Sequence, residues 1–395
     1  MPTRVSTSLA ALLLIVSVGV PASPRTPTND AQVLETLPTR AGDTAARELA
    51  RLRAAVAQTP NDPQRVEELA QRYVDLAMAR GDPRYVGYAE AVLNGFTTAL
   101  PAPLLTLRGV LRQYRHDFSG ALQDFAAALA LAPDHAIAHA WRGAVFLVQA
   151  DYAAASLECE ALRRMNREAL AGGCLGLTQA YGGQLEAGYK TLQRTLERVS
   201  NADNRLWLLT RLGEVAAWRG QPAQAKAHYL EALKLGRDDV YLLAAWSDFL
   251  LDNGQPAEVA RLLAAWESAD SLLLRLTEAQ SALQLPDAPR HRQMLADRFA
   301  AARARGDTTH RAEEARFELR LRHDPRTALR LAQENYALQR EPRDARILLE
   351  AAIAAKDSAG AQSVRDWLSR SGFEDARTRQ WAQTSTQVGL TGEKR

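Results

Sequence analysis

The sequence predicts an all-α fold, a right-handed superhelical solenoid built from antiparallel helix pairs. Four glycines recur at spacings of 34, 33 and 37 residues, namely Gly109, Gly143, Gly176 and Gly213. Twelve residues after each glycine stands another small residue, namely Ala121, Ala155, Gly188 and Ala225. Sixteen residues after each glycine stands a larger one, namely Phe125, Cys159, Leu192 and Tyr229. A period near 34 is typical of helical repeats, which bury their apolar faces only by stacking on their neighbours.

The N-terminus has the pattern of a cleavable export signal. Arg4 provides a basic start, residues 9–20 are apolar without a charge, and Val20-Pro21-Ala22 offers small residues for cleavage before Ser23. We therefore expect a signal peptide at 1–22 and a periplasmic or secreted protein. A retained anchor is the alternative, although twelve apolar residues are fewer than the roughly 20 that span a bilayer. We expect no stable membrane insertion after cleavage.

Composition fits a folded protein and argues against a nucleic-acid partner. Apolar residues make up 47% of the chain, charged residues 24%, and the formal net charge is only +3. A nucleic-acid binder shows a basic domain with clustered Lys and Arg, which this chain lacks. Arginine outnumbers lysine 44 to 5, which is typical of a GC-rich bacterial genome.

The rest of the chain divides by its periodicity. Residues 23–42 are rich in Pro, Thr and Asp, and we expect a flexible linker there. Helical periodicity covers 43–385, with clear repeats at about 102–268 and degenerate helix pairs before and after them. Atypical geometry is expected near 271–307, a terminal capping helix near 373–384, and a disordered tail at 386–395.

The clearest unit, from about Leu104 to Pro133, resembles the tetratricopeptide repeat (TPR) family. It has Gly109, the turn His116-Asp117-Phe118, then small, aromatic, small and proline positions at Ala121, Phe125, Ala128 and Pro133. Small residues on both helices permit close approach, so we expect Gly109 to face Ala121. Proline cannot continue a helix and ends the unit. The resemblance implies a right-handed superhelix whose first helices line a concave, peptide-binding groove.

The two cysteines offer a candidate disulfide. Cys159 and Cys174 are 15 residues apart, across one predicted interhelical turn. Pairing is favoured in an oxidising compartment, and two separate buried thiols are the alternative. A redox-catalytic role is disfavoured because there is no Cys-x-x-Cys motif.

The sequence offers no catalytic constellation, and we expect no cofactor and no metal. It contains no phosphate-binding glycine loop, no Gly-x-Ser-x-Gly and no His-Glu-x-x-His. His135 and His139 stand four apart, a spacing that can hold a metal only with a third ligand. Surface or packing roles are the simpler interpretation for both histidines.

The resemblance places one set of residues in the groove. By repeat register they are Tyr181, Trp207, Arg211, Glu214, Trp218, Tyr241 and Asp248. Aromatic residues and arginine are the types that form binding hot spots. Packing of Trp207 and Trp218 between units is the competing interpretation. Thr210, Glu214 and Asp248 stand where the family's carboxylate clamp has Lys and Asn, so capture of a terminal carboxylate is not supported.

These observations favour a non-catalytic scaffold of the bacterial envelope that binds a partner protein or extended peptide in its groove. An accessory adaptor of polysaccharide export or cell-wall synthesis is the alternative. A remote third is an enzyme whose site lies in the irregular span 271–320. Neither the partner's identity nor the oligomeric state follows from the sequence.

Overall fold

The computed structural model describes residues 43–392, with side chains described up to residue 387. The predicted signal peptide and linker lie outside the described residues. Contacts divide the chain into two compact units, residues 1–48 and 49–395. Everything that follows concerns the second unit, apart from the first turns of α1.

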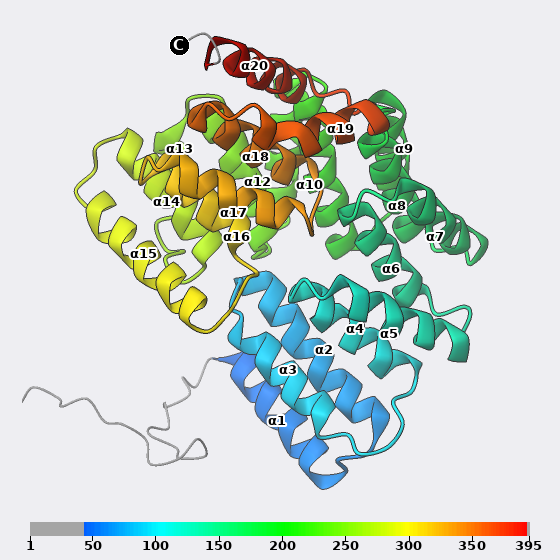
Figure 1. The fold of residues 1–395 in the computed structure, drawn as a ribbon. Coiled ribbons are helices and arrows are strands. Elements are labelled where there is room, and N and C mark those ends of the chain that lie inside the picture. The colour runs from blue at the N-terminus through cyan, green and yellow to red at the C-terminus, as the bar shows by residue number, and fades with distance from the viewer. Residues whose placement is uncertain (1–42, 393–395) are drawn as a thin grey trace, which may run out of the picture. The chain divides into compact units, whose positions relative to one another are not determined.

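All regular structure in residues 43–392 is helical, which confirms the predicted all-α solenoid (Figure 1). Before the clear repeats stand α1 (Thr44–Gln58), α2 (Pro63–Arg80) and α3 (Arg84–Asn94). The clear repeats are the pairs α4 (Ala102–Tyr114) with α5 (Phe118–Leu131), α6 (Ala136–Val148) with α7 (Tyr152–Arg164), α8 (Glu168–Tyr181) with α9 (Leu185–Arg198), α10 (Ala202–Trp218) with α11 (Pro222–Leu233), and α12 (Val240–Asp252) with α13 (Pro256–Leu262). Then come α14 (Asp270–Ala282), α15 (Ala288–Ala304), α16 (Arg311–Arg320), α17 (Pro325–Tyr336), α18 (Pro342–Ala355), the short 3-10 helix η1 (Ala359–Ala361), α19 (Gln362–Ser371) and α20 (Ala376–Gly392).

Helices pack in sequence order, as a repeat array requires. Each first helix contacts its own second helix, and α4, α6, α8, α10 and α12 also contact one another in succession. The second helices of several pairs begin at an aspartate cap. Asp117, Asp151 and Asp324 each accept a hydrogen bond from the backbone N–H three residues later, at 3.0 to 3.1 Å. These caps satisfy amides that have no partner inside the helix.

The repeat glycines make room for the neighbouring helix, although one expected contact differs. A Cβ on Gly109 would lie 2.5 Å from Cε1 of Phe125, so this glycine accommodates the aromatic ring rather than Ala121. The ring is larger than the alanine and fills the space that the missing side chain leaves. Gly176 likewise accommodates the large residue of its unit, since a Cβ there would lie 2.6 Å from Cγ of Leu192, and it also lies close to its small partner, with the carbonyl oxygen of Gly188 at 3.1 Å.

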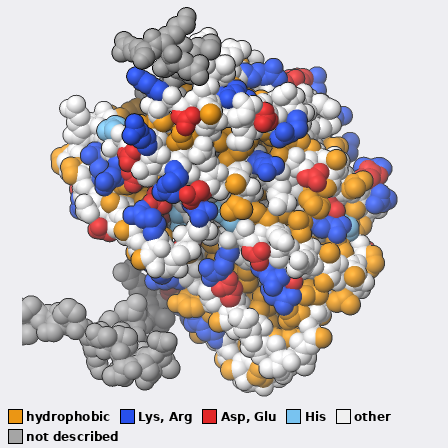
Figure 2. Space-filling view, viewed as in Figure 1, with side chains coloured by type: hydrophobic (Ala, Val, Ile, Leu, Met, Phe, Trp, Pro, Cys, Tyr) orange, Lys and Arg blue, Asp and Glu red, His pale blue; other side chains and the backbone are white. Residues whose placement is uncertain are grey.

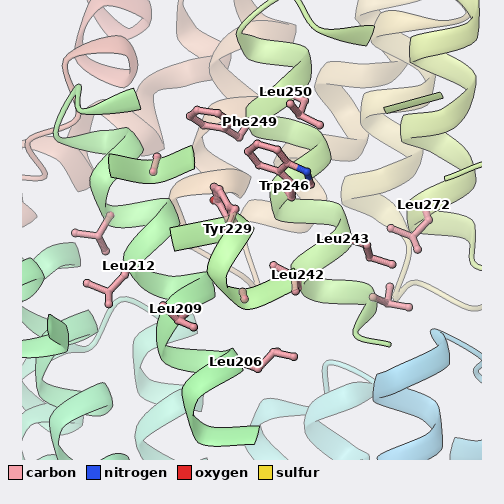
Figure 3. Packing of buried hydrophobic residues seen from close by; sticks show 14 of the residues in the cluster. Leu206, Leu209, Leu212, Tyr229, Leu242, Leu243, Trp246, Phe249, Leu250 and Leu272 are labelled. Atoms are coloured by element: carbon pink, nitrogen blue, oxygen red, sulfur yellow. The ribbon is translucent and has the colours of Figure 1, made fainter. Parts of the chain in front are cut away.

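The core runs from repeat to repeat and is rich in leucine. Figure 3 shows Leu206, Leu209 and Leu212 following one another along α10. The ring of Tyr229 on α11 lies 5.3 Å from that of Trp246 and 5.7 Å from that of Phe249, both on α12. Aromatic pairs at such distances add to the stability that burial alone provides.

The C-terminal part is helical to a greater extent than the sequence predicts. Helix α20 packs on α18, as expected of a terminal capping helix. It continues to Gly392, through most of the span predicted to be a disordered tail. No glycine or proline interrupts residues 376–388, so nothing in that stretch ends the helix. Among the described helices, none combines the length and apolar character needed to span a membrane.

Candidate partner-binding groove

The seven predicted groove residues lie on three successive first helices. Tyr181 ends α8, four of the residues lie on α10, and Tyr241 and Asp248 lie on α12. Six of the seven form two clusters and one charged bridge, described below. Trp207 stands apart. It packs on Gly173 of α8, where no Cβ would fit beside the indole ring, and therefore fills the space between two repeats.

The first cluster joins Arg211, Glu214 and Tyr241. The Arg211 guanidinium lies 4.2 Å from the centre of the Tyr241 ring and donates a hydrogen bond of 2.9 Å to Glu214 Oε2. The Tyr241 hydroxyl donates to Glu214 Oε1 at 2.6 Å. Burial raises the pKa of Tyr241 above its usual range, so the hydroxyl keeps its proton and remains a donor. Glu214 therefore has both oxygens engaged inside the groove.

The second cluster is a circuit of five aromatic residues. The ring of Tyr181 lies 6.4 Å from that of Tyr152 and 5.8 Å from that of Trp218, all three on the repeats. The ring of Trp218 lies 5.5 Å from that of Phe373, which in turn lies 5.2 Å from that of Trp367. A hydrogen bond of 2.8 Å from Trp367 Nε1 to the Tyr152 hydroxyl closes the circuit. Two of its five members thus come from the end of the chain.

These contacts belong to a larger arrangement in which residues 325–387, here called the C-terminal module, lie against the groove. The module comprises α17, α18, η1, α19 and α20. In Figure 1, α17 and α18 lie in front of α10 and α12, and α19 lies close to the ends of α8 and α9. The backbone N–H of Arg340 donates to the carbonyl oxygen of Val148, the last residue of α6, at 2.7 Å.

A charged bridge also joins the groove to α14 and α16. Asp248 accepts a hydrogen bond of 2.6 Å from Arg275 Nη2 and pairs at 2.6 Å with Arg316 Nη1. Burial alone would raise the pKa of Asp248, but the two guanidinium groups outweigh it and hold this pKa well below its usual range. On the face seen in Figure 2, basic and acidic side chains stand next to one another over α14 and α16. Asp248 is therefore a fixed anion within the protein.

Asp252 is the groove residue that the sequence analysis missed. It receives two hydrogen bonds of 2.6 Å from Arg346 of α18, and Arg377 of α20 lies 2.9 Å from Oδ2. Asp252 holds the same place in its repeat as Tyr181 and Trp218 hold in theirs. The repeat register therefore contained the signal, whereas nothing in the sequence marked its arginine partners.

A polar cavity of about 160 Å³ lies where α12, α14, α16 and α18 meet. Five arginines line it, namely Arg275, Arg316, Arg320, Arg343 and Arg346. Carboxylates lie among them, including Asp248, Glu313, Asp344 and Glu350. The charges nearly balance, so this part of the groove suits polar groups more than an apolar side chain.

The cysteines and the paired histidines lie away from the groove contacts. Cys159 and Cys174 form a disulfide between α7 and α8, with their Cα atoms 5.4 Å apart. His139 is buried, with Nδ1 2.6 Å from Glu158 Oε2 and Nε2 3.0 Å from the carbonyl oxygen of Pro133. Both ring nitrogens are engaged, so the imidazole serves packing. Within residues 43–387 no group of three His, Cys, Asp or Glu side chains is placed to hold a metal ion.

Comparison with known proteins yields likenesses of fold alone. No protein-family model matches the chain, and no curated protein matches it. Among solved structures, a tetratricopeptide repeat protein from Parabacteroides merdae is 15% identical with a TM-score of 0.44, covering 60% of this chain and 92% of that one. Yeast Tom70 is 12% identical with a TM-score of 0.44, covering 82% of this chain and 62% of that one. The TPR domain of P58(IPK) is 16% identical with a TM-score of 0.24, covering 85% and 100%. These scores are low, so the description of this chain as a helical solenoid rests on its own consecutive helix pairs.

Proposed function

We propose that this chain is a non-catalytic protein-interaction scaffold of the bacterial envelope, which binds a segment of a partner protein in the groove formed by α8, α10 and α12. One observation carries the proposal. Trp218 and Asp252, which hold equivalent positions in successive repeats, already bind a stretch of polypeptide, namely the chain's own C-terminal module, and Tyr181 at the equivalent position of the preceding repeat packs on Trp218. A surface that holds protein by aromatic contact and charge pairing has the chemistry that protein recognition uses.

The state of the groove side chains supports a binding role over a catalytic one. Asp248 is paired with two guanidinium groups, and Glu214 accepts from both Arg211 and Tyr241. A general base must have a lone pair free to take a proton from a substrate. These carboxylates instead hold fixed positions that present a defined pattern of charge to a polypeptide.

The envelope location is supported by the predicted leader and by the cysteine pair. The Cys159–Cys174 disulfide fits an oxidising compartment, since such bonds form and persist outside the cytosol. Export would place the groove where proteins and peptides of the cell envelope reach it. Cell fractionation tests this part, and recovery of the chain with an intact leader in the cytoplasm would contradict it.

Photo-crosslinking in living cells tests the binding role. A photoreactive residue is placed at Trp218 or Tyr241 in the groove, and at Leu157, which is 71% exposed on α7, as the control. We expect one envelope protein to be crosslinked from both groove positions and not from Leu157. Crosslinks from Leu157 alone, or a groove that never yields a crosslinked protein, would contradict a groove-binding scaffold.

A further inference from the structure

The C-terminal module has a hydrophobic core of its own. Buried residues of α17, α18 and α19, with Phe373 and Ala382, form a cluster that also includes Ala315 of α16 and is separate from the larger cluster that includes α8–α14. From the clear repeats, only Ala150 and Trp218 pack against this cluster. The remaining contacts described above are ion pairs and hydrogen bonds. Interfaces of this polar kind resemble those between separable proteins more than the interior of one domain.

A short stretch between α19 and α20 makes several of the groove contacts. Residues 372–375 are not helical, and they begin with Gly372 at φ 67°. The Phe373 ring packs edge-to-face against Trp218, and Glu374 Oε2 accepts a hydrogen bond of 2.8 Å from the backbone N–H of Leu185, the first residue of α9. A carboxylate there also benefits from the positive end of the helix dipole. Three residues later, Arg377 reaches Asp252.

The groove is shaped for the backbone of this stretch as well as for its side chains. Gly183, in the turn between α8 and α9, has φ 81°, and a Cβ on it would lie 2.6 Å from the carbonyl oxygen of Ser371. Only glycine combines this conformation with so close an approach of another backbone. The repeats thus supply a backbone notch, an aromatic surface, a free amide and an acid, spread over α8–α9, α10 and α12.

We propose that residues 373–377 are an internal ligand of the groove, and that the partner is a protein segment of the same chemistry: an aromatic residue, a carboxylate directly after it, and an arginine three residues after the carboxylate. This inference rests on the proposed function and specifies its partner. When no partner is bound, the chain's own Phe373, Glu374 and Arg377 occupy the groove. A partner segment takes the same positions on Trp218, the Leu185 amide and Asp252 when α19 and α20 move away.

Competition between the two occupants gives a measurable signature. The probe is a fluorescein-labelled peptide with the sequence of residues 369–381, titrated against the purified full chain by fluorescence polarisation. The release variant carries Glu374→Gln and Arg377→Ala, two exposed side chains whose loss leaves the module's core intact. We expect the peptide to bind the release variant at least about tenfold more tightly than the wild type. In the release variant the internal ligand no longer occupies the groove in most of the molecules, so a larger fraction of them can bind the peptide.

Matched controls locate the binding site. Adding Trp218→Ala or Asp252→Asn to the release variant should abolish the gain in peptide affinity. A peptide with alanine at the Phe373 position should not bind. Leu157→Ala, on the exposed face of α7, should leave the peptide affinity unchanged. Phe373→Ala in the full chain serves as a second release variant. Hydrogen exchange of the release variants should rise in α19 and α20 while α4–α11 remain protected.

Three results would overturn the inference. They are equal peptide affinity in wild type and both release variants, a gain that survives Trp218→Ala, and loss of exchange protection throughout α4–α11. A concentration-dependent dimer that the peptide does not dissociate would instead assign the groove to the C-terminal module of a second copy. If the peptide fails while photoreactive residues at the Trp218 and Tyr241 positions still crosslink an envelope protein, the scaffold function stands and this partner chemistry is rejected.

Discussion

The indole Nε1 of Trp367 donates a hydrogen bond of 2.8 Å to the hydroxyl of Tyr152, joining two residues that are 215 positions apart in the chain. Trp367 is 2% exposed, and burial raises the pKa of Tyr152 to about 12, so the hydroxyl stays protonated under ordinary conditions. The bond ties the first turn of α7 to α19. It is therefore a local measure of how strongly the C-terminal module holds to the repeats.

Removing this bond should loosen the module. Tyr152→Phe deletes the hydroxyl and leaves the buried indole N–H without a partner, which costs about 1–3 kcal/mol of stability. Trp367→Phe removes the donor together with packing, so a double-mutant cycle with Tyr152→Phe isolates the bond itself. Urea unfolding gives the free energies, and we expect a coupling of about 1 kcal/mol. Additive single effects would mean that the bond contributes no net stability.

Gly109 and Gly87, both in helices, test the repeat register, because a side chain packs closely against the first and none packs against the second. A Cβ on Gly109 would meet the Phe125 ring, whereas a Cβ on Gly87 in α3 would meet nothing within 4 Å. Gly109→Ala should therefore cost about 1–3 kcal/mol through overpacking. Gly87→Ala should stabilise the protein by about 0.5–1 kcal/mol, because alanine favours a helix. Thermal unfolding of both variants checks this, and a neutral Gly109→Ala would contradict the close packing of α4 on α5.

The repeat pattern predicted how the helices pair, but it did not predict where the C-terminal module contacts the repeats. Periodic glycines and the Asp117 and Asp151 caps follow from local rules, so the helix pairs and their turns could be predicted. The same register placed Tyr181 and Trp218 on the groove. Phe373, the partner of Trp218, and Trp367, the partner of Tyr152, lie more than 150 residues away from them and carry no periodic signal. Where these residues lie depends on how many repeats separate them from the groove. Local sequence patterns carry no information about that long-range arrangement.

The disulfide should contribute a stability that depends on redox conditions. It closes a loop across the turn between α7 and α8, with a sequence separation of 15. A loop of this length corresponds to about 3 kcal/mol in the chain-entropy model. Urea unfolding with and without a reductant should show a loss of that order in the wild type. The double variant Cys159→Ala and Cys174→Ala should have the lower free energy of unfolding of the reduced protein, with or without the reductant. If the free energy of unfolding of the wild type does not change although quantified free thiols show that the disulfide has been reduced, the bond does not stabilise the protein.

Asp344 should make the folded state less stable as the pH rises towards neutrality. Its carboxyl accepts hydrogen bonds from Asn335 Nδ2 at 2.9 Å and from the backbone N–H of Glu341 at 3.1 Å. Burial raises the pKa of Asp344 to about 7, even though the Arg343 guanidinium acts in the opposite direction. The unfolded carboxyl loses its proton near pH 4. Between about pH 4 and pH 7 the folded state therefore binds more protons, and the free energy of unfolding falls as the pH rises.

Asp344→Asn removes this titration, because the amide stays neutral at every pH. The free energy of unfolding of the variant minus that of the wild type should rise between about pH 4 and pH 7, by at most about 1.4 kcal/mol per pH unit. Above about pH 7 the difference should level off. Groups that titrate alike in both proteins cancel in this difference. A difference that does not change with pH would mean that the Asp344 carboxyl ionises in the folded protein as it does in the unfolded chain.

His116 lines the same cavity as Asp344 and should act in the opposite direction. Burial lowers the pKa of His116 to about 4, and its neutral ring lies 2.8 Å from Nε2 of Gln339. The unfolded imidazole still holds its proton up to about pH 6.5. Between about pH 4 and pH 6.5 the unfolded state therefore binds more protons at this group, and stability rises with pH.

The substitution His116→Asn isolates this effect, because asparagine tolerates the left-handed backbone that His116 adopts at φ 61°. The free energy of unfolding of the variant minus that of the wild type should fall between about pH 4 and pH 6.5, opposite to the slope for Asp344→Asn. Urea unfolding at matched pH values compares the two variants directly. Slopes of the same sign, or a flat line for His116→Asn, would mean that the cavity lets water solvate the charged imidazole and that burial does not govern its protonation.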